Sequence, residues 1–394
     1  MFKKLSEKPR RGTKLRSAPR VGKLLRRLSA ARGDGLEALS KSELKLRKEL
    51  GKQTSAARTK LVGALRVIQP VKADIVCFGM VVPAVLLIVD QLPEHNTGGL
   101  VKQASEFISD DAAIIACLMR GWKVRSALIG TALGDDARGR ATRQELKRLG
   151  VINDLRLTKD MATPYEVVVS DRVGARTYFW ERSPALLATL DAADLSLIRG
   201  AKLLYVDWYD GDHILRAMDE ADRRKVPVYL NLEHGHLEAD TFQRYGPRAR
   251  IVQAVTDPAQ KEDRDPVDVL HKLLDAGAET AVVTMASDGC VAARRAEGEI
   301  LRAYAPKIEV IDANGAGATF SAGLAYGHIK RWSLEEAVRF AVAAASLKCT
   351  VVGPTAFPVR TIKRLAKEIK VERVNPVASS ALRSTGVLHY EQPV

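Results

Sequence analysis

The sequence has few cysteines, few aromatic residues and no long hydrophobic run. Its four cysteines show no paired metal-ligand spacing, and each lies in an apolar segment: Cys77, Cys117, Cys290 and Cys349. We therefore expect reduced core thiols. The longest apolar stretch, residues 75–89, is too short to cross a bilayer and contains Pro83. The absence of an apolar segment after the basic start argues against a secretory signal. These features favour a folded cytoplasmic protein without a transmembrane segment.

Acidic residues are scarce at the N-terminus. Residues 1–72 contain 21 Lys and Arg but only 5 Asp and Glu, whereas the rest of the chain is close to neutral. Residues 1–35 are predicted to be a disordered basic arm, because they offer little apolar surface to bury. Three roles remain open for this arm: binding of nucleic acid or another polyanion, an organelle transit peptide, or a solvated tail.

The rest of the chain divides into three parts. Residues 36–72 are predicted to form a helical extension, residues 73–358 a globular domain, and residues 359–394 a C-terminal helix followed by a loose tail. Within the globular part, buried strand-like runs alternate with helical segments. This alternation predicts an α/β fold with a doubly wound, mostly parallel sheet. Ligands of such sheets bind beyond the carboxyl ends of the strands.

One loop carries the strongest functional signal. The β-branched run Ile308–Ile311 is expected to be a strand that ends in a turn of small residues, and a helix is expected over Gly315–Gly327. Glycines at 315 and 317 would let consecutive amides and the helix N-terminus converge on one point, which is a seat for an anion. A plain strand–turn–helix connection is the alternative.

The segment from Asp312 to Gly323 resembles the signature of the ribokinase-like, or PfkB, family of sugar and nucleoside kinases. The family pattern is Asp-Thr-x-Gly-Ala-Gly-Asp-Thr-Phe, followed by a small residue and Ala-Gly. The resemblance extends over residues 73–358 and implies a doubly wound α/β domain with a small β-lid, whose strands lie near 84–104 and 165–180. It also implies phosphorylation of a sugar or nucleoside with ATP and Mg²⁺, and a homodimer joined through the lid.

The departures from the family pattern are equally informative. Ala318 stands where the family has its catalytic aspartate, and Ala84 where it has a sugar-binding aspartate. The Gly-Gly-Asn sugar-binding segment is replaced by residues 109–111, and the Asn-x-x-Glu element that organises the metal has no match in residues 251–258. We therefore assign no metal ligand, and Mg²⁺ is in doubt.

The resemblance assigns the remaining site residues by position. Gly315, Ala316 and Gly317 would supply the anion-binding amides around the lost base at Ala318. Contacts with the nucleotide are expected from Thr284, Ala286, Asp288, Gly289 and Asn314. Contacts with the phosphate acceptor are expected from Ala84, Asp110, Asp111 and Asp312. Asp312 is also a candidate substitute base, while Asp110, Asp111, Asp135 and Asp136 have the alternative role of helix N-caps.

Two further groups remain open. Glu233, His234 and His236 have the spacing of a metal cluster, but no third ligand is in evidence. Residues 207–210 follow a predicted strand and either line the cleft or form a simple turn.

Two functions from different classes follow. The first is an ATP-dependent sugar or nucleoside kinase, weakened because a general base typically contributes about 10²–10⁴-fold to the rate. The second is an inactive pseudokinase that binds a nucleotide and is tethered to nucleic acid or an assembly by residues 1–35.

Overall fold

The computed structural model describes residues 72–172, 174–238, 240–256 and 265–374. The predicted basic arm, nearly all of the predicted helical extension and the end of the predicted C-terminal tail lie outside these residues. Among the helices of the described part, none is long and apolar enough to cross a membrane.

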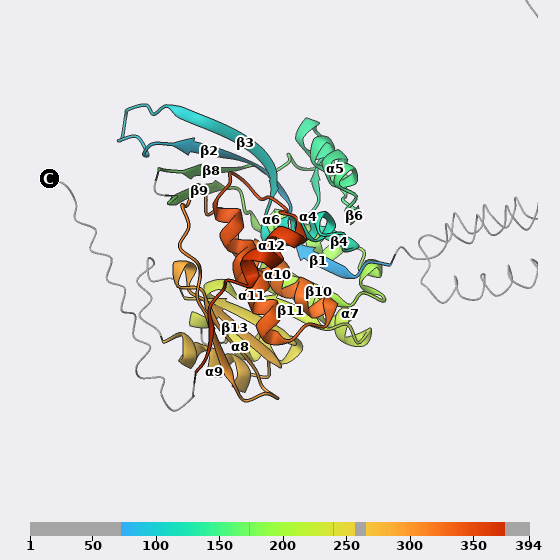
Figure 1. Cartoon of the computed structure of the whole chain (residues 1–394). Coiled ribbons are helices and arrows are strands. Elements are labelled where there is room, and N and C mark those ends of the chain that lie inside the picture. The colour runs from blue at the N-terminus through green and yellow to red at the C-terminus, as the bar shows by residue number, and fades with distance from the viewer. Residues whose placement is uncertain (1–71, 173, 239, 257–264, 375–394) are drawn as a thin grey trace, which may run out of the picture. The chain divides into compact units, whose positions relative to one another are not determined.

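A ten-stranded sheet forms the centre of the domain, in the order β16-β15-β14-β13-β12-β11-β10-β1-β4-β6 (Figure 1). Its parallel part consists of β1 (Ile75–Gly79), β4 (Ser126–Gly130), β6 (Ile152–Asn153), β10 (Leu203–Asp207), β11 (Val228–Asn231), β12 (Ile251–Val255) and β13 (Thr280–Thr284). Three antiparallel strands extend one edge: β14 (Cys290–Arg294), β15 (Ile300–Ala303) and β16 (Val371–Val374). The predicted α/β class with a mostly parallel sheet is confirmed, while the antiparallel edge was not predicted.

Helices cover both faces of this sheet. One core contains α4 (Asp111–Gly121), α10 (Ala316–Lys330), α11 (Leu334–Cys349) and α12 (Val359–Ala366), with a residue of α5 (Ala137–Leu149). The opposite core contains α7 (Leu215–Arg223) and α9 (Pro266–Asp275). Short helices α6 (Pro184–Ala188) and α8 (Thr241–Tyr245) lie in connections. Successive strand residues alternate between the cores: Tyr205 faces the first and Leu204 the second.

A second sheet is the predicted small β-lid, in the order β3-β2-β8-β9 (Figure 1). It consists of β2 (Val82–Val89), β3 (Val101–Ser109), β8 (Glu166–Ser170) and β9 (Arg176–Trp180). Buried and half-buried positions alternate along β8, as expected for a sheet with one face toward the core. A short pair, β5 (Leu133–Gly134) and β7 (Leu157–Thr158), adjoins α5 in sequence.

The expected cap at the start of α5 is present on Asp136. Its carboxylate accepts hydrogen bonds from Gly139 N at 2.8 Å and from Thr163 N at 2.8 Å. These bonds stabilise the charged form and lower the pKa of Asp136 to about 2. One aspartate therefore holds both the helix start and the neighbouring loop.

The prediction of a strand over Ile308–Ile311 was wrong. Residues 304–314 contain no strand, and Val310 and Ile311 remain 39% and 43% exposed. Instead of pairing with a sheet edge, Ile311 N donates to Cys349 O at the end of α11, at 2.8 Å. The helix then begins at Ala316, one residue later than expected, because Gly315 has a φ of 75° and serves as its N-cap.

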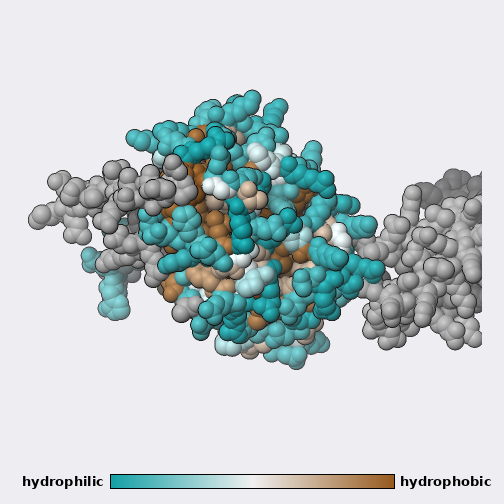
Figure 2. Space-filling view, turned by 90° about the horizontal axis from the view of Figure 1, so that it is seen from below, coloured by the Kyte–Doolittle hydropathy of each residue, from teal (hydrophilic) through white to brown (hydrophobic). Residues whose placement is uncertain are grey.

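Polar and charged side chains predominate on the face shown in Figure 2, and hydrophobic residues appear between them. Most of the large apolar residues belong to the two cores.

Candidate functional site

A row of polar side chains crosses three central strands, at the carboxyl ends of β10 and β11 and in the middle of β12. Asp207 on β10 pairs with Asn231 on β11, and Asn231 pairs with Gln253 on β12. All three are buried, with Asn231 and Gln253 fully so. Tyr205 and Tyr229, two residues earlier, face the first core, so the row points toward the helices of that core. This is the sheet edge at which ligands of α/β proteins bind.

Five further carboxyl groups lie around this row, and together with Asp207 we call them the acidic cluster: Asp110, Asp111, Glu166, Asp207, Asp210 and Glu233. Asn231 Nδ2 connects three of them. It donates to Asp207 Oδ2 at 2.9 Å and to Asp111 Oδ2 at 3.4 Å, and it also bonds to Glu233 Oε1. Asn231 therefore joins the start of α4 to the ends of β10 and β11 in one network.

Arg182 balances part of this negative charge. Its guanidinium pairs with Asp110 and, at 3.1 Å, with Asp210. Asp210 Oδ2 also accepts from Met80 N at 3.3 Å. A Cβ atom at Gly79 would lie only 2.4 Å from that same oxygen, so glycine is required there for Asp210 to reach its place.

Burial raises the pKa of most carboxyls in the cluster. Desolvation, followed by repulsion from Glu233, raises the pKa of Asp111 well above its usual range, and desolvation followed by repulsion from Asp111 does the same for Asp207. Desolvation raises the pKa of Glu166 and of Asp210 to about 7. Several of these groups are therefore protonated near neutral pH unless a cation replaces the proton.

A metal ion would find one suitable group within the described ranges. Oxygens of Asp111, Asp207 and Glu233 lie within 4.8 Å of one another, and such oxygens suit Mg²⁺. The two histidines of the predicted Glu-His-Gly-His cluster are not part of this group, and His236 Nδ1 lies 3.0 Å from the main-chain oxygen of Glu233.

The loop that leads into α10, residues 313–318, presents unpaired amides, and we call it the amide loop. Ala316 N donates to Ala313 O at 3.2 Å and Thr319 N to Gly315 O at 2.9 Å, whereas Gly317 N and Ala318 N bond to no atom of the described residues. A Cβ atom at Gly317 would meet nothing within 4 Å, so open space lies in front of this loop. Free amides at a helix N-terminus are the usual seat of an anion.

Position 318, where the sequence resemblance implies a missing base, is apolar. Ala318 is 1% exposed and belongs to the first core. Asp312 does not suit the role of substitute base, because its carboxylate is already bound: Oδ2 lies 2.6 Å from Lys348 Nζ and accepts from Gly353 N at 2.9 Å.

The acidic cluster adjoins the amide loop. The side chain of Ile114, one turn into α4, lies 3.7 Å from the position of a Cβ on Gly315. Tyr178 on the lid donates from its hydroxyl to Asn314 Oδ1 at 3.2 Å. Burial, opposed by Arg176 and reinforced by Glu166 and Asp111, raises the pKa of this tyrosine. The lid thus spans the space between cluster and loop.

The predicted nucleotide contacts lie partly on a neighbouring strand end. Thr284 ends β13, and residues 286–288 form a short 3₁₀ turn. Ala286 has a φ of 45°, a conformation that favours glycine. Gly289, with φ 87°, could not carry a side chain, because its Cβ would lie 2.1 Å from Ala303 O. The Nδ2 atom of Asn314 is buried without a partner among the described residues.

The predicted acceptor residues separate into three places, of which the pair of Asp312 with Lys348 is one. Asp110 and Asp111 belong to the acidic cluster, and Asp110 also caps α4 by accepting from Asp111 N at 3.0 Å. Ala84 instead lines a cavity of about 800 Å³ between the lid, α4 and α5, together with Phe107, Tyr165 and others. None of the six carboxyls lines that cavity.

The sequence reasoning missed Glu166, Arg182 and Asn231, and it left Asp207, Asp210 and Glu233 without a common site. They come from separate segments that only the sheet order brings together. The available signal was a polar residue directly after each buried strand.

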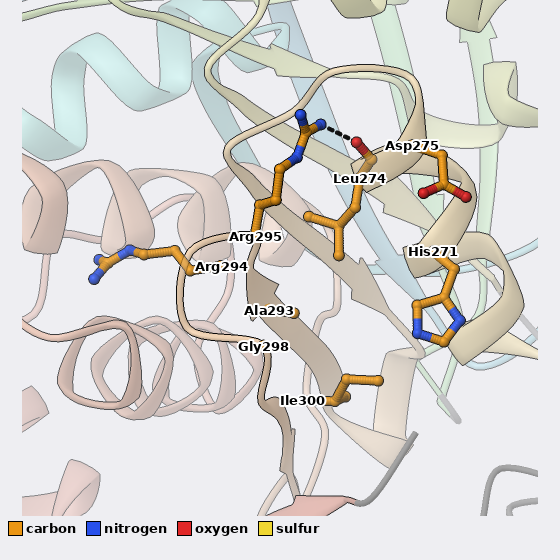
Figure 3. A pocket seen from close by; sticks show the side chains of 8 residues that line it. All are labelled: His271, Leu274, Asp275, Ala293, Arg294, Arg295, Gly298 and Ile300. Carbon is orange, nitrogen blue, oxygen red and sulfur yellow. Dashed lines mark hydrogen bonds between the residues drawn. The ribbon is translucent and has the colours of Figure 1, made fainter. Parts of the chain in front are cut away.

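A smaller cavity of about 390 Å³ lies between α9 and the β14–β15 hairpin (Figure 3). Arg295 bonds across it to Leu274 O, and Arg294 points away from the other labelled side chains. Arg294 pairs with Thr280 at the start of β13. This cavity therefore lies at the opposite end of the strands from the candidate site.

Glu166 gives the site a measurable pH dependence. It is 8% exposed and its pKa is raised from 4.5 to about 7. The folded protein therefore binds this proton more tightly than the unfolded chain, and the free energy of unfolding falls as the pH rises from about 4.5 to 7. We expect Glu166→Gln to stabilise the protein at pH 8 by up to about 3 kcal/mol, and by much less at pH 5.

Urea unfolding of both proteins at the two pH values measures this difference. The exposed Glu106 on β3, in the same sheet, provides the control variant, Glu106→Gln, for which we expect no such change. An equal effect of Glu166→Gln at pH 5 and pH 8 would contradict the assignment.

Comparison with known proteins agrees with this geometry. Residues 72–362 match the model of the pfkB family carbohydrate kinases. The chain is 34% identical over 98 residues to 1-phosphofructokinase of Vibrio cholerae, covering 25% of this chain and 30% of the relative. It is 33% identical over 148 residues to acarbose 7(IV)-phosphotransferase of an Actinoplanes species, covering 36% of this chain and 46% of the relative. The matches thus span less than half of these curated relatives.

Ribokinase of Arabidopsis thaliana, solved with ribose and ATP, has the same fold, with a TM-score of 0.58 and 19% identity over 75% of this chain and 99% of that one. At this identity the likeness supports the fold alone. The family match covers well over half of the sequence, and the chain therefore belongs to the pfkB family of carbohydrate kinases.

Proposed function

We propose that this protein is an ATP-dependent kinase for a sugar or nucleoside hydroxyl, with a weakened proton-transfer step. The observation that carries the proposal is the amide loop: Gly317 N and Ala318 N are unpaired among the described residues, and open space lies beside Gly317, while the side chain at 318 is a methyl group. The amides would stabilise the negative charge of a transferring phosphoryl group. No carboxylate at 318 is available to accept the hydroxyl proton.

Alignment of ATP and the acceptor hydroxyl would supply most of the rate acceleration that remains without a base at position 318. Phosphoryl transfer depends largely on alignment and charge neutralisation, so loss of one base slows the reaction without abolishing it. If Mg²⁺ takes part, Asp111, Asp207 and Glu233 are the described residues that would hold it, and the ion would supply neutralisation of phosphate charge. Thr284, Ala286, Asp288, Gly289 and Asn314 remain our proposed nucleotide contacts.

The acidic cluster favours an uncharged acceptor. Six carboxyls face one paired guanidinium, Arg182. A sugar that already bears a phosphate would be repelled wherever these groups are ionised. We therefore infer that the acceptor is a neutral sugar or nucleoside rather than a sugar phosphate.

The test is ATP binding by calorimetry, followed by ADP release with a panel of neutral sugars, nucleosides and sugar phosphates. We expect ATP binding and a turnover with neutral acceptors about 10²–10⁴-fold below the usual kinase range of about 1–100 s⁻¹. Sugar phosphates should give no turnover above background. Turnover in the usual range would contradict the weakened step, and absence of ATP binding would contradict the kinase proposal.

The apolar surroundings of Ala318 favour one alternative, an inactive pseudokinase. Ala318 is packed in the core, and Asp312 is committed to Lys348. In that case the protein would bind ATP with no turnover for any acceptor, and it would serve as a scaffold tethered through residues 1–35. The same panel separates the two functions.

A further inference from the structure

Lys348 is the one lysine among the described residues whose side chain is fully buried in an ion pair. It lies in the last turn of α11, and its partner Asp312 immediately precedes the amide loop. Both side chains of the pair are 0% exposed. A cation at a helix C-terminus interacts favourably with the helix dipole, yet a fully buried pair still loses its hydration and gives little stability compared with apolar residues.

The partners of Lys348 match an ammonium ion. Nζ donates to Asp312 Oδ2 at 2.6 Å, to Asp312 O at 2.7 Å and to Val351 O at 3.3 Å. These are three acceptors for the three N–H donors of a charged lysine, with no acceptor left over. A carboxylate and two main-chain oxygens around one positive charge also form the kind of oxygen site that binds a small cation.

The same carboxylate fixes the start of the loop. Asp312 Oδ1 accepts from Asn314 N at 2.8 Å, and Oδ2 accepts from Gly353 N at 2.9 Å. Asp312 N in turn donates to Cys349 O at 3.2 Å. The residue before the amide loop is therefore held on its main chain and on both carboxylate oxygens, and Lys348 neutralises the charge that this arrangement buries.

The amides of the loop need such support. Unpaired N–H dipoles that point to a common space repel one another, and a loop that had to be ordered by its ligand would lose affinity. Because the charge of Lys348 is already matched by Asp312, the lysine does not itself bind the phosphate. Its effect must pass through the shape of residues 312–318.

We propose that Lys348 is a positioning residue: a built-in cation that holds the amide loop in its anion-binding shape, so that the loop needs no soluble monovalent cation. The inference rests on the proposed function insofar as the anion is the phosphate of ATP. It predicts that removing the side chain leaves a site of three oxygens that a small soluble cation refills.

The experiment compares wild type, Lys348→Ala and Lys348→Met in ammonium, methylammonium and tetramethylammonium chloride at matched ionic strength. The readouts are Tm and the Kd for ATP. In tetramethylammonium we expect both variants to bind ATP roughly 5- to 150-fold more weakly than wild type, the usual range of coupling between sites. In ammonium or methylammonium, Lys348→Ala should recover both Tm and affinity. Lys348→Met, whose side chain fills the space, should recover neither.

Three results would overturn the inference. The first is a rise in the Tm of Lys348→Ala in ammonium with no change in its Kd for ATP, which would make the lysine purely structural. The variant could bind ATP as wild type does in all three salts. Wild type could itself require ammonium.

The experiment still tests the inference if a variant is unstable or if the proposed function is wrong. If Lys348→Ala folds only in ammonium, that requirement is itself the expected rescue. The double variant Asp312→Asn/Lys348→Met buries no charge and therefore tests the amide loop in the absence of any cation. We expect it to bind ATP weakly in every salt. Failure of the proposed function is distinct: wild type would not bind ATP in any salt, while the ammonium-dependent Tm of Lys348→Ala would persist.

Discussion

We expect Ala318→Asp to phosphorylate its acceptor about 10²–10⁴-fold faster than wild type, because it restores a proton acceptor beside the amide loop. Position 318 lies in the first turn of α10, where a negative charge is favoured by the helix dipole. Since Ala318 is 1% exposed, the new carboxylate is also partly desolvated, which raises its pKa toward the range of an effective base.

The matched control for this variant is Ala318→Asn. It has nearly the same shape but cannot accept a proton at neutral pH. Steady-state kcat for the two variants and wild type, measured with the best acceptor of the panel, separates the base from a change in packing. If asparagine accelerates turnover as much as aspartate does, proton transfer is not what position 318 lacks. If aspartate changes nothing and wild type is already fast, another group serves as base.

We expect Gly317→Ala to weaken ATP binding at least about tenfold, a loss of about 1.4 kcal/mol, while making the protein slightly more stable. The two effects have separate causes. The added methyl group would meet no protein atom within 4 Å, so the fold accommodates it. Alanine is also the better helix former, by about 0.5–1 kcal/mol. The methyl group would instead enter the space where the phosphate is expected.

A second glycine of α10 gives the opposite pattern. A Cβ at Gly323 would lie 2.6 Å from the Cα of Ala341, so Gly323→Ala should lower stability by overpacking. Calorimetric Kd values for ATP and urea unfolding of both variants measure the contrast. A Gly317→Ala variant that binds ATP like wild type would place the phosphate elsewhere and remove the main support for the proposed function.

The sequence predicted the fold well where its signals were local. Alternating buried runs and helical segments predicted the mostly parallel sheet. The run Ile308–Ile311 was misjudged because β-branched residues have the same pattern whether they pair with a strand or lie against a helix end. The antiparallel strand β16 was missed because two of its four residues, Glu372 and Arg373, are charged and stand side by side, so no alternating apolar pattern marks it.

The candidate site was harder to predict, for a physical reason. The glycines of the amide loop have a local signature, since backbone amides converge within a few residues. The acidic cluster has none: Asp111, Asp207 and Glu233 are about a hundred and then about twenty-five residues apart in sequence, and only the strand order brings them together. Lys348 likewise resembled an ordinary basic residue in the last turn of a helix until its contacts with Asp312 were visible.

The raised pKa values of the acidic cluster have a thermodynamic consequence for the whole protein. Near neutral pH the native protein retains protons on carboxyls that ionise once the chain opens, as the pKa of about 7 for both Glu166 and Asp210 indicates. Unfolding then transfers protons to the solvent. The heat of denaturation would accordingly include the ionisation enthalpy of the buffer and differ between phosphate and Tris.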